Sequence, residues 1–380
     1  MIENPEKKIR VGYVTDLPLT PAGGGSYGVN WHAYRELARC FAMTYHGPIV
    51  PRQPRFAKLF SKVKRRILGV PGRYTYFSET TLDSNARAVA SRLTSDVDAI
   101  VFRSAGRWCR VRPTVPYFIY LDAVVHTFFH NTFNAGDFDR DDLSRIFEQE
   151  ARFLESADAV FFESKWGMQQ AREAYSLKGS HYVAVGRGGV IEPPERDKWD
   201  GSSHSLVSIA MNFKQKGGHV VLNAYRTLKA RFASLTWDIV GGDPGFDWTQ
   251  LDGIRYHGVL DPNEAGDRLR LETILQNAFL LVHPTTEDTS PLVITEAAYF
   301  GCPSISVNAF AVPELIVHGV TGLLMNTASA GALVAAVTEL FENKVRYRDM
   351  RHNARELALS QSRWEKVGGL MCDRIAATLR

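Results

Sequence analysis

Residues 279–306 constrain the fold of this chain more than any other part of its sequence. An apolar run, Phe279–Val282, is followed by a polar turn, and helical spacing then continues from Pro291 to Phe300. A Gly-Cys-Pro sequence ends the helix before a second short apolar run. Strand, turn, helix and strand in this order form the repeating unit of a parallel α/β sheet. We therefore expect an α/β protein.

The predicted start of this helix has the features of an anion site. Ser290 is suited to the N-cap position, and Pro291 to the first helical position, where its missing N–H has no cost. Free N–H groups and a partial positive charge attract anions, and the flanking Asp288 and Glu296 can bind hydroxyls. The pattern favours a ligand with phosphate and sugar. The alternative is an ordinary crossover with acids at its rim.

Length and composition narrow the class of protein. The 380 residues fit two domains, and 45% hydrophobic and 23% charged residues are typical of a globular protein. A net charge of +4 is too small to indicate nucleic-acid binding. No apolar run approaches the length of a membrane span. The four cysteines are far apart in sequence, so we expect neither structural zinc nor a disulfide framework. This cysteine usage fits a reducing compartment, and we therefore expect a cytoplasmic enzyme.

A glycine-rich loop follows the first predicted strand, Ile9–Thr15. Gly23, Gly24 and Gly25 precede a helix expected over 27–41, and such glycines let the backbone approach a ligand closely. The loop is long and proline-rich and lacks the acidic residue of the dinucleotide fingerprint. A phosphate or sugar contact and a plain flexible turn both stay open.

Residues 52–73 are strongly basic. They carry eight lysines and arginines and no acid, and their apolar residues fall on one helical face. A basic amphipathic helix can lie on an anionic membrane or bind a phosphorylated acceptor. The alternative is a surface helix that packs on its own domain.

Further candidates follow predicted strands. Asp122 comes directly after the strand Tyr117–Leu121, at the position where open α/β sheets place their chemistry, and His126 and His130 follow it. Two histidines without a third ligand do not predict zinc.

The second half repeats the alternation of strand and helix after a linker at 186–204. Its first strand, Leu206–Met211, leads into a basic glycine turn in which Lys216 is placed to neutralise a phosphate. A Lys-Gly pair is also a common helix boundary, so a structural role stays open.

In this order, these segments resemble the family-4 glycosyltransferases, which are retaining enzymes with the GT-B fold. The resemblance rests on SIAMNFKQKGGHVVLNAYRTL, on FLLVHPTTEDTSPLVITEAAYFGCPSISV with the following VPELIVHGVTGLL, and on the glycine loop and SADAVFFESKWGMQQA of the first half. It implies two Rossmann-like doubly wound domains facing a central cleft, at 1–190 (acceptor) and 204–360 (sugar nucleotide). A C-terminal helix at 361–380 would pack back on the first domain.

The resemblance also implies roles for single residues. Lys216 would hold the donor diphosphate, Glu296 the ribose hydroxyls, and Asp288 the donor sugar in place of the family's glutamate; Glu287 is one position too far away. The donor would also meet residues of the glycine loop, the lysine turn and the turn before the helix, namely Gly24, Gly25, Lys214, Thr289, Ser290, Pro291 and Leu292.

Three positions depart from the family pattern. Met211 or Ala210 stands where an arginine is usual, and Lys214 is the nearest replacement charge. The histidine of the catalytic loop is replaced by Asp122, so Asp122 or His126 takes its role. Phe310 occupies a position usually given to glycine.

The implied activity is metal-independent transfer of a hexose-type sugar from a UDP- or GDP-type donor, as co-substrate and without a cofactor. The acceptor would be a hydroxyl of a glycan, a lipid-linked acceptor or a small molecule, with peripheral contact to the inner membrane face through 52–73. A non-catalytic GT-B protein that binds nucleotide or glycan, and a sugar-nucleotide epimerase, are the alternatives.

Overall fold

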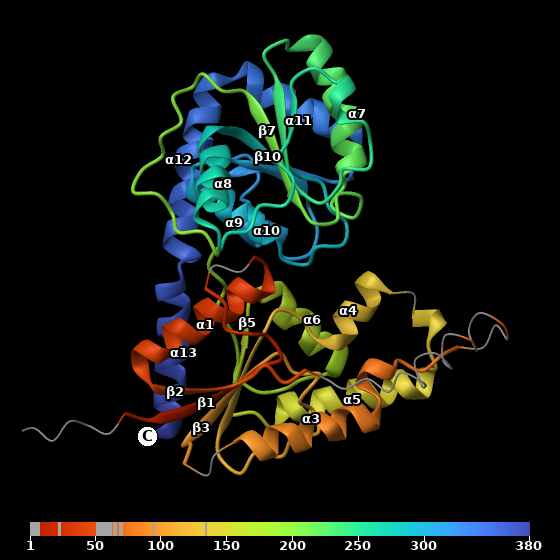
Figure 1. The fold of residues 1–380 in the computed structure, drawn as a ribbon, viewed down its shortest axis with the longest axis vertical. Coiled ribbons are helices and arrows are strands. Elements are labelled where there is room, and N and C mark those ends of the chain that lie inside the picture. The colour runs from red at the N-terminus through yellow and green to blue at the C-terminus, as the bar shows by residue number, and fades with distance from the viewer. Residues whose placement is uncertain are drawn as a thin grey trace, which may run out of the picture. The chain divides into compact units, whose positions relative to one another are not determined.

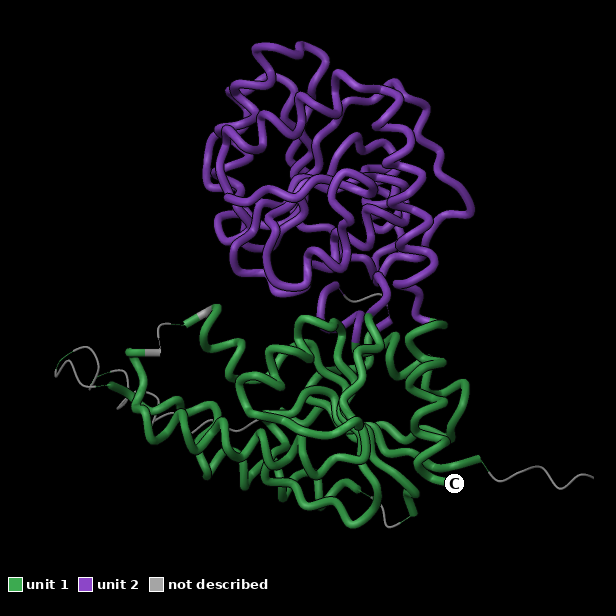
Figure 2. The backbone as a smooth tube through the Cα atoms, turned by 180° about the vertical axis from the view of Figure 1, so that it is seen from behind, with its two compact units in different colours: residues 1–20, 30–186, 365–380 green, residues 21–29, 187–364 purple. Residues whose placement is uncertain are grey.

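The computed structural model describes residues 8–21, 24–50, 63, 67, 71–93, 96–133 and 135–380. The basic segment 52–73 lies outside these residues except for Val63, Ile67 and 71–73. The chain forms two compact units, which Figure 2 shows in different colours. Unit 1 comprises residues 1–20, 30–186 and 365–380, and unit 2 comprises residues 21–29 and 187–364.

Unit 1 contains a six-stranded parallel sheet with the order β2-β1-β3-β4-β5-β6. Its strands are β1 (Arg10–Val14), β2 (Ala42–His46), β3 (Ala99–Arg103), β4 (Tyr117–Leu121), β5 (Ala159–Phe162) and β6 (Tyr182–Ala184). Strands β3, β4 and β5 are buried throughout, as their continuous apolar sequences require. The two-sided burial explains why these central strands are recognisable in the sequence.

Helices flank the sheet of unit 1 (Figure 1). They are α1 (Ser26–Cys40), α3 (Glu79–Arg92), α4 (Val125–Thr132), α5 (Arg140–Glu155), α6 (Lys165–Tyr175) and α13 (Trp364–Leu379), with short 3₁₀ helices η1 (Thr75–Phe77) and η2 (Ala135–Asp137). Side chains of α3, α4 and α5 share one core with β3, β4 and β5, including Val89, Phe129 and Phe153. Helix α13, at the end of the described chain, lies in the same unit as β1.

Unit 2 contains a second parallel sheet with the order β12-β11-β10-β7-β8-β9. Its strands are β7 (Ser205–Ala210), β8 (Thr236–Gly241), β9 (Ile254–Tyr256), β10 (Ala278–His283), β11 (Ser304–Val307) and β12 (Gly322–Met325). Its helices are α7 (Gly218–Arg231), α8 (Ala265–Asn277), α9 (Leu292–Tyr299), α10 (Val312–Leu315), α11 (Ala330–Glu342) and α12 (Lys344–Gln361), with η3 (Trp248–Gln250).

The strands of unit 2 bury side chains on both faces. Leu206 and Leu280 pack into the core under α7 and α11, whereas the next residues, Val207 and Leu281, pack into the core with α8, α9 and α12. Successive side chains of a strand point to opposite faces, so one apolar run supplies both cores. Helices therefore cover both faces of the sheet, and a ligand can approach it at the strand ends and their turns.

Cys40 and Cys372 form a disulfide within unit 1, a single pairing that the expectation of no disulfide framework did not include. The two residues are 332 positions apart in sequence, but their Cα atoms are 6.3 Å apart because α13 packs on α1. Gly368 of α13 allows this approach, since an added Cβ would collide with Glu36. Cys109 and Cys302 are buried free thiols. Among the described residues, no helix is both long and apolar enough to cross a membrane.

Candidate functional site

The segments that follow β7, β9 and β10, together with the end of β8, surround a cavity of about 570 Å³ in unit 2. These segments lie at the carboxyl edge of the parallel sheet, where open α/β sheets bind ligands. Six of the predicted residues line the cavity: Gly24, Gly25, Lys216, Asp288, Leu292 and Glu296. The structure thus brings together the glycine loop, the lysine turn and the two acids within one unit.

Lys216 and Asp288 form an ion pair in this cavity, with 2.7 Å between Nζ and Oδ2. Lys216 belongs to a tight turn in which its backbone N–H donates to Asn212 and that of Gly217 donates to Lys214. Burial by itself would raise the pKa of Asp288, but contacts with His283 and Lys216 hold it well below its usual range. Asp288 is therefore an anion, and Lys216 is its main charge partner.

Glu296 lies on α9 and is buried, with a carboxylate oxygen that accepts from the backbone N–H of Val190 at 3.0 Å. Burial raises the pKa of Glu296 to about 7, although hydrogen bonds from Val190 and Ile191 oppose the shift. The neighbouring Tyr299 accepts from the backbone N–H of Gly189 at 2.9 Å. The segment 187–191 thus fixes the position of α9 and of its acid.

Helix α9 begins one residue later than the sequence predicts. Pro291, rather than Ser290, has the N-cap conformation, and α9 begins at Leu292. Ser290 instead accepts hydrogen bonds from Arg187 at its backbone oxygen and, at 3.1 Å, at its hydroxyl. Thr289 accepts from the N–H of Ala311 at 3.0 Å. Tertiary contacts with 187 and 311 replace the local cap that the sequence suggested.

Other predicted donor contacts lie outside the lining of the cavity, namely Lys214, Thr289, Ser290 and Pro291. Lys214 is exposed on the same turn as Lys216. Met211, which stands where an arginine is usual, lines the cavity and is 71% exposed. Phe310 has a left-handed backbone with a φ of 56°, a conformation that favours glycine.

Asp122 and His126 belong to unit 1. Asp122 is exposed directly after β4, and its carboxylate accepts from the N–H of Ala123 at 2.8 Å. The ring of His126 stacks on His130 at 4.0 Å. Burial and His130 together lower the pKa of His126.

A buried carboxylate supports the start of α4. Glu150 accepts from the backbone N–H of Val125 at 2.7 Å and from the hydroxyl of Tyr175 at 2.6 Å. The hydroxyl of Tyr175 in turn accepts from the N–H of His126 at 3.1 Å. Burial raises the pKa of Glu150 to about 7. This network positions the loop that carries Asp122 and His126.

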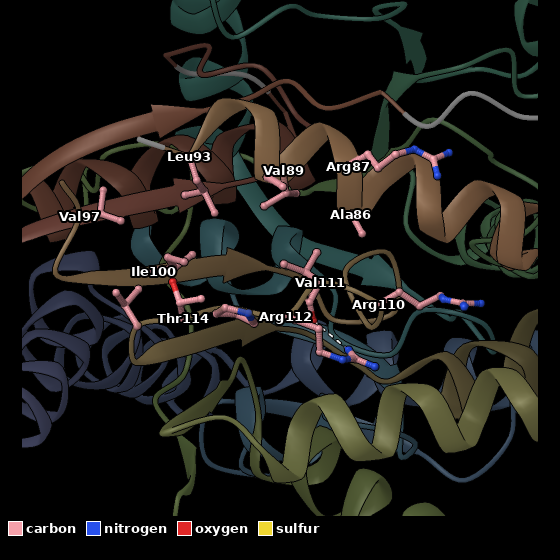
Figure 3. Close-up of a pocket in the computed structure, with 13 residues that line it drawn as sticks. Ala86, Arg87, Val89, Leu93, Val97, Ile100, Arg110, Val111, Arg112 and Thr114 are labelled. Carbon is pink, nitrogen blue, oxygen red and sulfur yellow. Dashed lines mark hydrogen bonds between the residues drawn. The ribbon is translucent and has the colours of Figure 1, made fainter. Parts of the chain in front are cut away.

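Unit 1 also has a cavity of about 470 Å³ between α3 and the connection from β3 to β4 (Figure 3). Val97 precedes β3 and Val115 precedes β4, so this cavity lies at the amino edge of the sheet. Asp122 follows β4 at the carboxyl edge. The cavity is thus separate from the predicted residues of unit 1. Over the residues that the structure describes, no group of three or more His, Cys, Asp or Glu side chains is arranged to hold a metal ion.

Three residues of these sites were missed by the sequence analysis: His283, Arg187 and Glu150. His283 is the last residue of β10 and lines the cavity beside Asp288. A polar residue at the end of an apolar strand is a signal for His283, as it was for Asp122. Arg187 and Glu150 act through tertiary contacts and have no comparable signal.

Comparison with known proteins relates the second half of the chain to one family. Residues 194–357 match the model of the glycosyl transferases group 1. The chain is 25% identical over 182 residues to a GDP-mannose-dependent alpha-(1-6)-phosphatidylinositol monomannoside mannosyltransferase of Mycobacterium tuberculosis, covering 46% of this chain and 47% of that protein. It is 25% identical over 181 residues to a putative colanic acid biosynthesis glycosyltransferase of Salmonella typhimurium, covering 45% and 42%. The matches span less than half the length of these relatives.

Solved structures match nearly the whole chain. Sucrose-phosphate synthase of Thermosynechococcus elongatus superimposes with a TM-score of 0.70 at 15% identity, covering 97% of this chain and 99% of that protein. HepE of Anabaena, in complex with UDP and glucose, gives a TM-score of 0.63 at 15% identity, covering 97% and 100%. The chain thus has the predicted GT-B fold with two Rossmann-like domains, and its residues 194–357 are similar to the glycosyl transferases group 1.

Proposed function

We propose that this protein is a retaining glycosyltransferase that moves a hexose-type sugar from a nucleoside diphosphate donor to a hydroxyl of an acceptor. The main support is the cavity of unit 2, in which Lys216, Asp288 and Glu296 lie beside Gly24 and Gly25. A cation, two acids and glycine backbone suit a ligand that joins a diphosphate to two sugars. The relatives support the class of donor, since one is GDP-mannose-dependent and HepE was solved with UDP and glucose.

The reaction breaks the bond between the anomeric carbon and the diphosphate and forms a bond to the acceptor oxygen. Negative charge grows on the leaving phosphate, and positive charge develops on the sugar ring. Lys216 and the N–H groups of the glycine loop would stabilise the leaving phosphate, and Asp288 would face the sugar. The leaving phosphate oxygen would take the acceptor's proton, with Asp122 or His126 positioning the sugar or the acceptor.

In this proposal neither a metal ion nor a cofactor is needed, because Lys216 and backbone donors carry the charge stabilisation. We expect turnover in the presence of EDTA to equal turnover without it. Retention would appear in the NMR spectrum of the product as an anomeric configuration equal to that of the donor.

A thermal-shift panel of UDP-, GDP-, ADP- and TDP-sugars identifies the donor, because a ligand that binds only the folded state raises the melting temperature. Transfer or hydrolysis of that donor then separates an enzyme from a non-catalytic binder, and the products separate a transferase from an epimerase. We expect Lys216→Ala and Glu296→Ala each to lower turnover at least about tenfold, or about 1.4 kcal/mol of transition-state stabilisation. Lys198→Ala, at an exposed lysine of unit 2 that does not line the cavity, is the matched comparison, and its turnover should stay close to that of wild type. Near-normal rates for both Lys216→Ala and Glu296→Ala would refute the assigned site.

The acceptor proposed is a glycan, a lipid-linked acceptor or a small molecule. We also propose that segment 52–73 contacts anionic membranes peripherally, on the basis of its charge alone. Co-sedimentation with anionic vesicles tests this contact. Vesicle binding that survives charge reversal of Lys62, Lys64, Arg65 and Arg66 would refute it.

A further inference from the structure

His283 has a buried ring nitrogen that lacks a hydrogen-bond partner among the described residues. The residue ends β10 and is 2% exposed, and its Nε2 atom is the unpartnered one. This nitrogen lies 3.5 Å from Oδ2 of Asp288, which is too long for a strong hydrogen bond. Buried polar atoms without partners are rare because they cost free energy, so this one calls for an explanation.

The same oxygen of Asp288 is occupied by Lys216 at 2.7 Å. Under the proposed function, Lys216 must also neutralise the donor diphosphate. A lysine that turns to the diphosphate weakens its contact with Asp288, and a partly buried carboxylate then needs another donor. Of the described residues, His283 is the other one with a basic side chain that pairs with the carboxylate of Asp288 within 4 Å.

We propose that His283 is a positioning residue of the donor site, whose Nε2–H becomes the hydrogen-bond partner of Asp288 when Lys216 turns to the diphosphate. The inference rests on the proposed function and extends it by a residue that the sequence analysis did not name. The imidazole then holds the carboxylate in the orientation that faces the donor sugar. The exchange needs only a small shift, from 3.5 Å to hydrogen-bond distance.

A second histidine of unit 2 shows what a purely structural pair looks like. Nε2 of His257 lies 2.7 Å from Oδ1 of Asp238, and Asp238 also receives hydrogen bonds from Arg255 and Ser205. The contact through Nε2 of His257 is closed, although its Nδ1 is also buried without a partner among the described residues, and the pair does not line the cavity. The pair of His283 and Asp288 is open and lines the cavity, which is the difference expected of a contact that forms during function.

Isothermal titration with UDP-glucose and GDP-mannose as probes tests the proposal. His283→Phe keeps the ring volume and removes the N–H, whereas His283→Gln retains a side-chain N–H. We expect His283→Phe to weaken binding of the accepted probe about tenfold and His283→Gln to stay within about threefold of wild type. In an Asp288→Asn background, His283→Phe should add less than about twofold, because its effect passes through that carboxylate.

His257→Phe is the matched control: it should lower the melting temperature and leave the affinity for the probe within about twofold of wild type. Equal losses of affinity from His283→Phe in the wild-type and Asp288→Asn backgrounds would overturn the inference, since they would mean that His283 acts independently of that carboxylate. Unchanged affinity of a folded His283→Phe variant would overturn the inference and leave the proposed function standing. A wild-type protein that binds no sugar nucleotide would overturn both.

Discussion

Lys216 and Asp288 are 72 positions apart in sequence, yet their charged groups lie 2.7 Å apart in the cavity of unit 2. The pair joins the turn before α7 to the turn before α9. A diphosphate carries the same sign of charge as Asp288 and therefore competes with it for the lysine. The ion pair consequently opposes binding of the diphosphate alone, although both residues serve the complete donor in the proposed function.

Replacement of Asp288 by asparagine should separate binding from turnover. We expect Asp288→Asn to bind UDP or GDP about threefold to tenfold more tightly, because Lys216 no longer has a competing carboxylate. Turnover should fall at least about tenfold, because the contact with the donor sugar is lost in the transition state. Calorimetry of the nucleotide and initial rates with the sugar nucleotide measure the two effects.

Glu287→Gln is the control for this prediction. Glu287 is the adjacent acid, is exposed, and does not line the cavity, so the same change of charge is made one residue away. We expect both its nucleotide affinity and its turnover to stay within about twofold of wild type. Equal effects at positions 287 and 288 would contradict the role given to the ion pair.

The central strands and the turns of the site could be predicted because their signals are local. Strand β10 is a continuous apolar run, since it is buried on both faces, and Asp288 follows it at a fixed spacing from Glu296. The edge strands β2 and β12 were missed. Strand β2 is half exposed along its length, so no continuous apolar run marks it.

Contacts between distant segments could not be predicted. The position of Arg187 against Ser290 and the disulfide between Cys40 and Cys372 depend on how helices pack. No local pattern encodes such pairs, because they are set by the tertiary fold. The same reason explains why the cap of α9 was assigned to Ser290, whose oxygens are taken by a distant arginine.

The buried carboxyl of Glu296 should make the stability of the protein depend on pH. Burial raises its pKa from 4.5 to about 7 in the folded state, so the folded protein favours the protonated form of this carboxyl more than the unfolded chain does. Its stabilising contribution is therefore complete below pH 4.5 and is lost as the pH rises toward 7. We expect wild type to lose up to about 3 kcal/mol relative to Glu296→Gln across this range. Denaturant unfolding of both proteins from pH 4.5 to 8 measures the difference.

The comparison with Glu296→Gln removes the contribution of Glu150, which has a similar pKa and is present in both proteins. Binding of a sugar nucleotide should also tighten in wild type between pH 6 and 8, because ribose hydroxyls donate to the ionised carboxylate. If the free energy of unfolding of wild type changed with pH in parallel with that of Glu296→Gln, the raised pKa of Glu296 would be contradicted.

Arg351 on α12 should be important for the stability of unit 2. Its guanidinium forms two hydrogen bonds with Asp197, at 2.8 and 2.7 Å, and donates to the backbone oxygens of Ala278 and Phe300. We expect Arg351→Met to cost about 3–5 kcal/mol, since it leaves buried carbonyls and a carboxylate without their partner. Arg346→Met, which breaks an exposed ion pair with Glu339 on the same unit, should cost less than about 1 kcal/mol. Chemical denaturation distinguishes the two, and similar losses would contradict the prediction.

Gly217 should be required for the geometry of Lys216, its neighbour in the turn. Its φ is 78°, and an added Cβ would collide with the backbone oxygen of Pro284, in the turn that leads to Asp288. Gly217→Ala should therefore push the two turns apart and weaken binding of the sugar nucleotide at least about tenfold.

Gly245 has a similar φ of 76° but no atom within 4 Å of an added Cβ. Gly245→Ala should thus cost only the backbone strain, about 1–2 kcal/mol, and leave the affinity unchanged. Calorimetry and thermal unfolding of both variants separate strain from displacement, and an equal loss of affinity in the two would show that the contact with Pro284 is not what holds Lys216 in place.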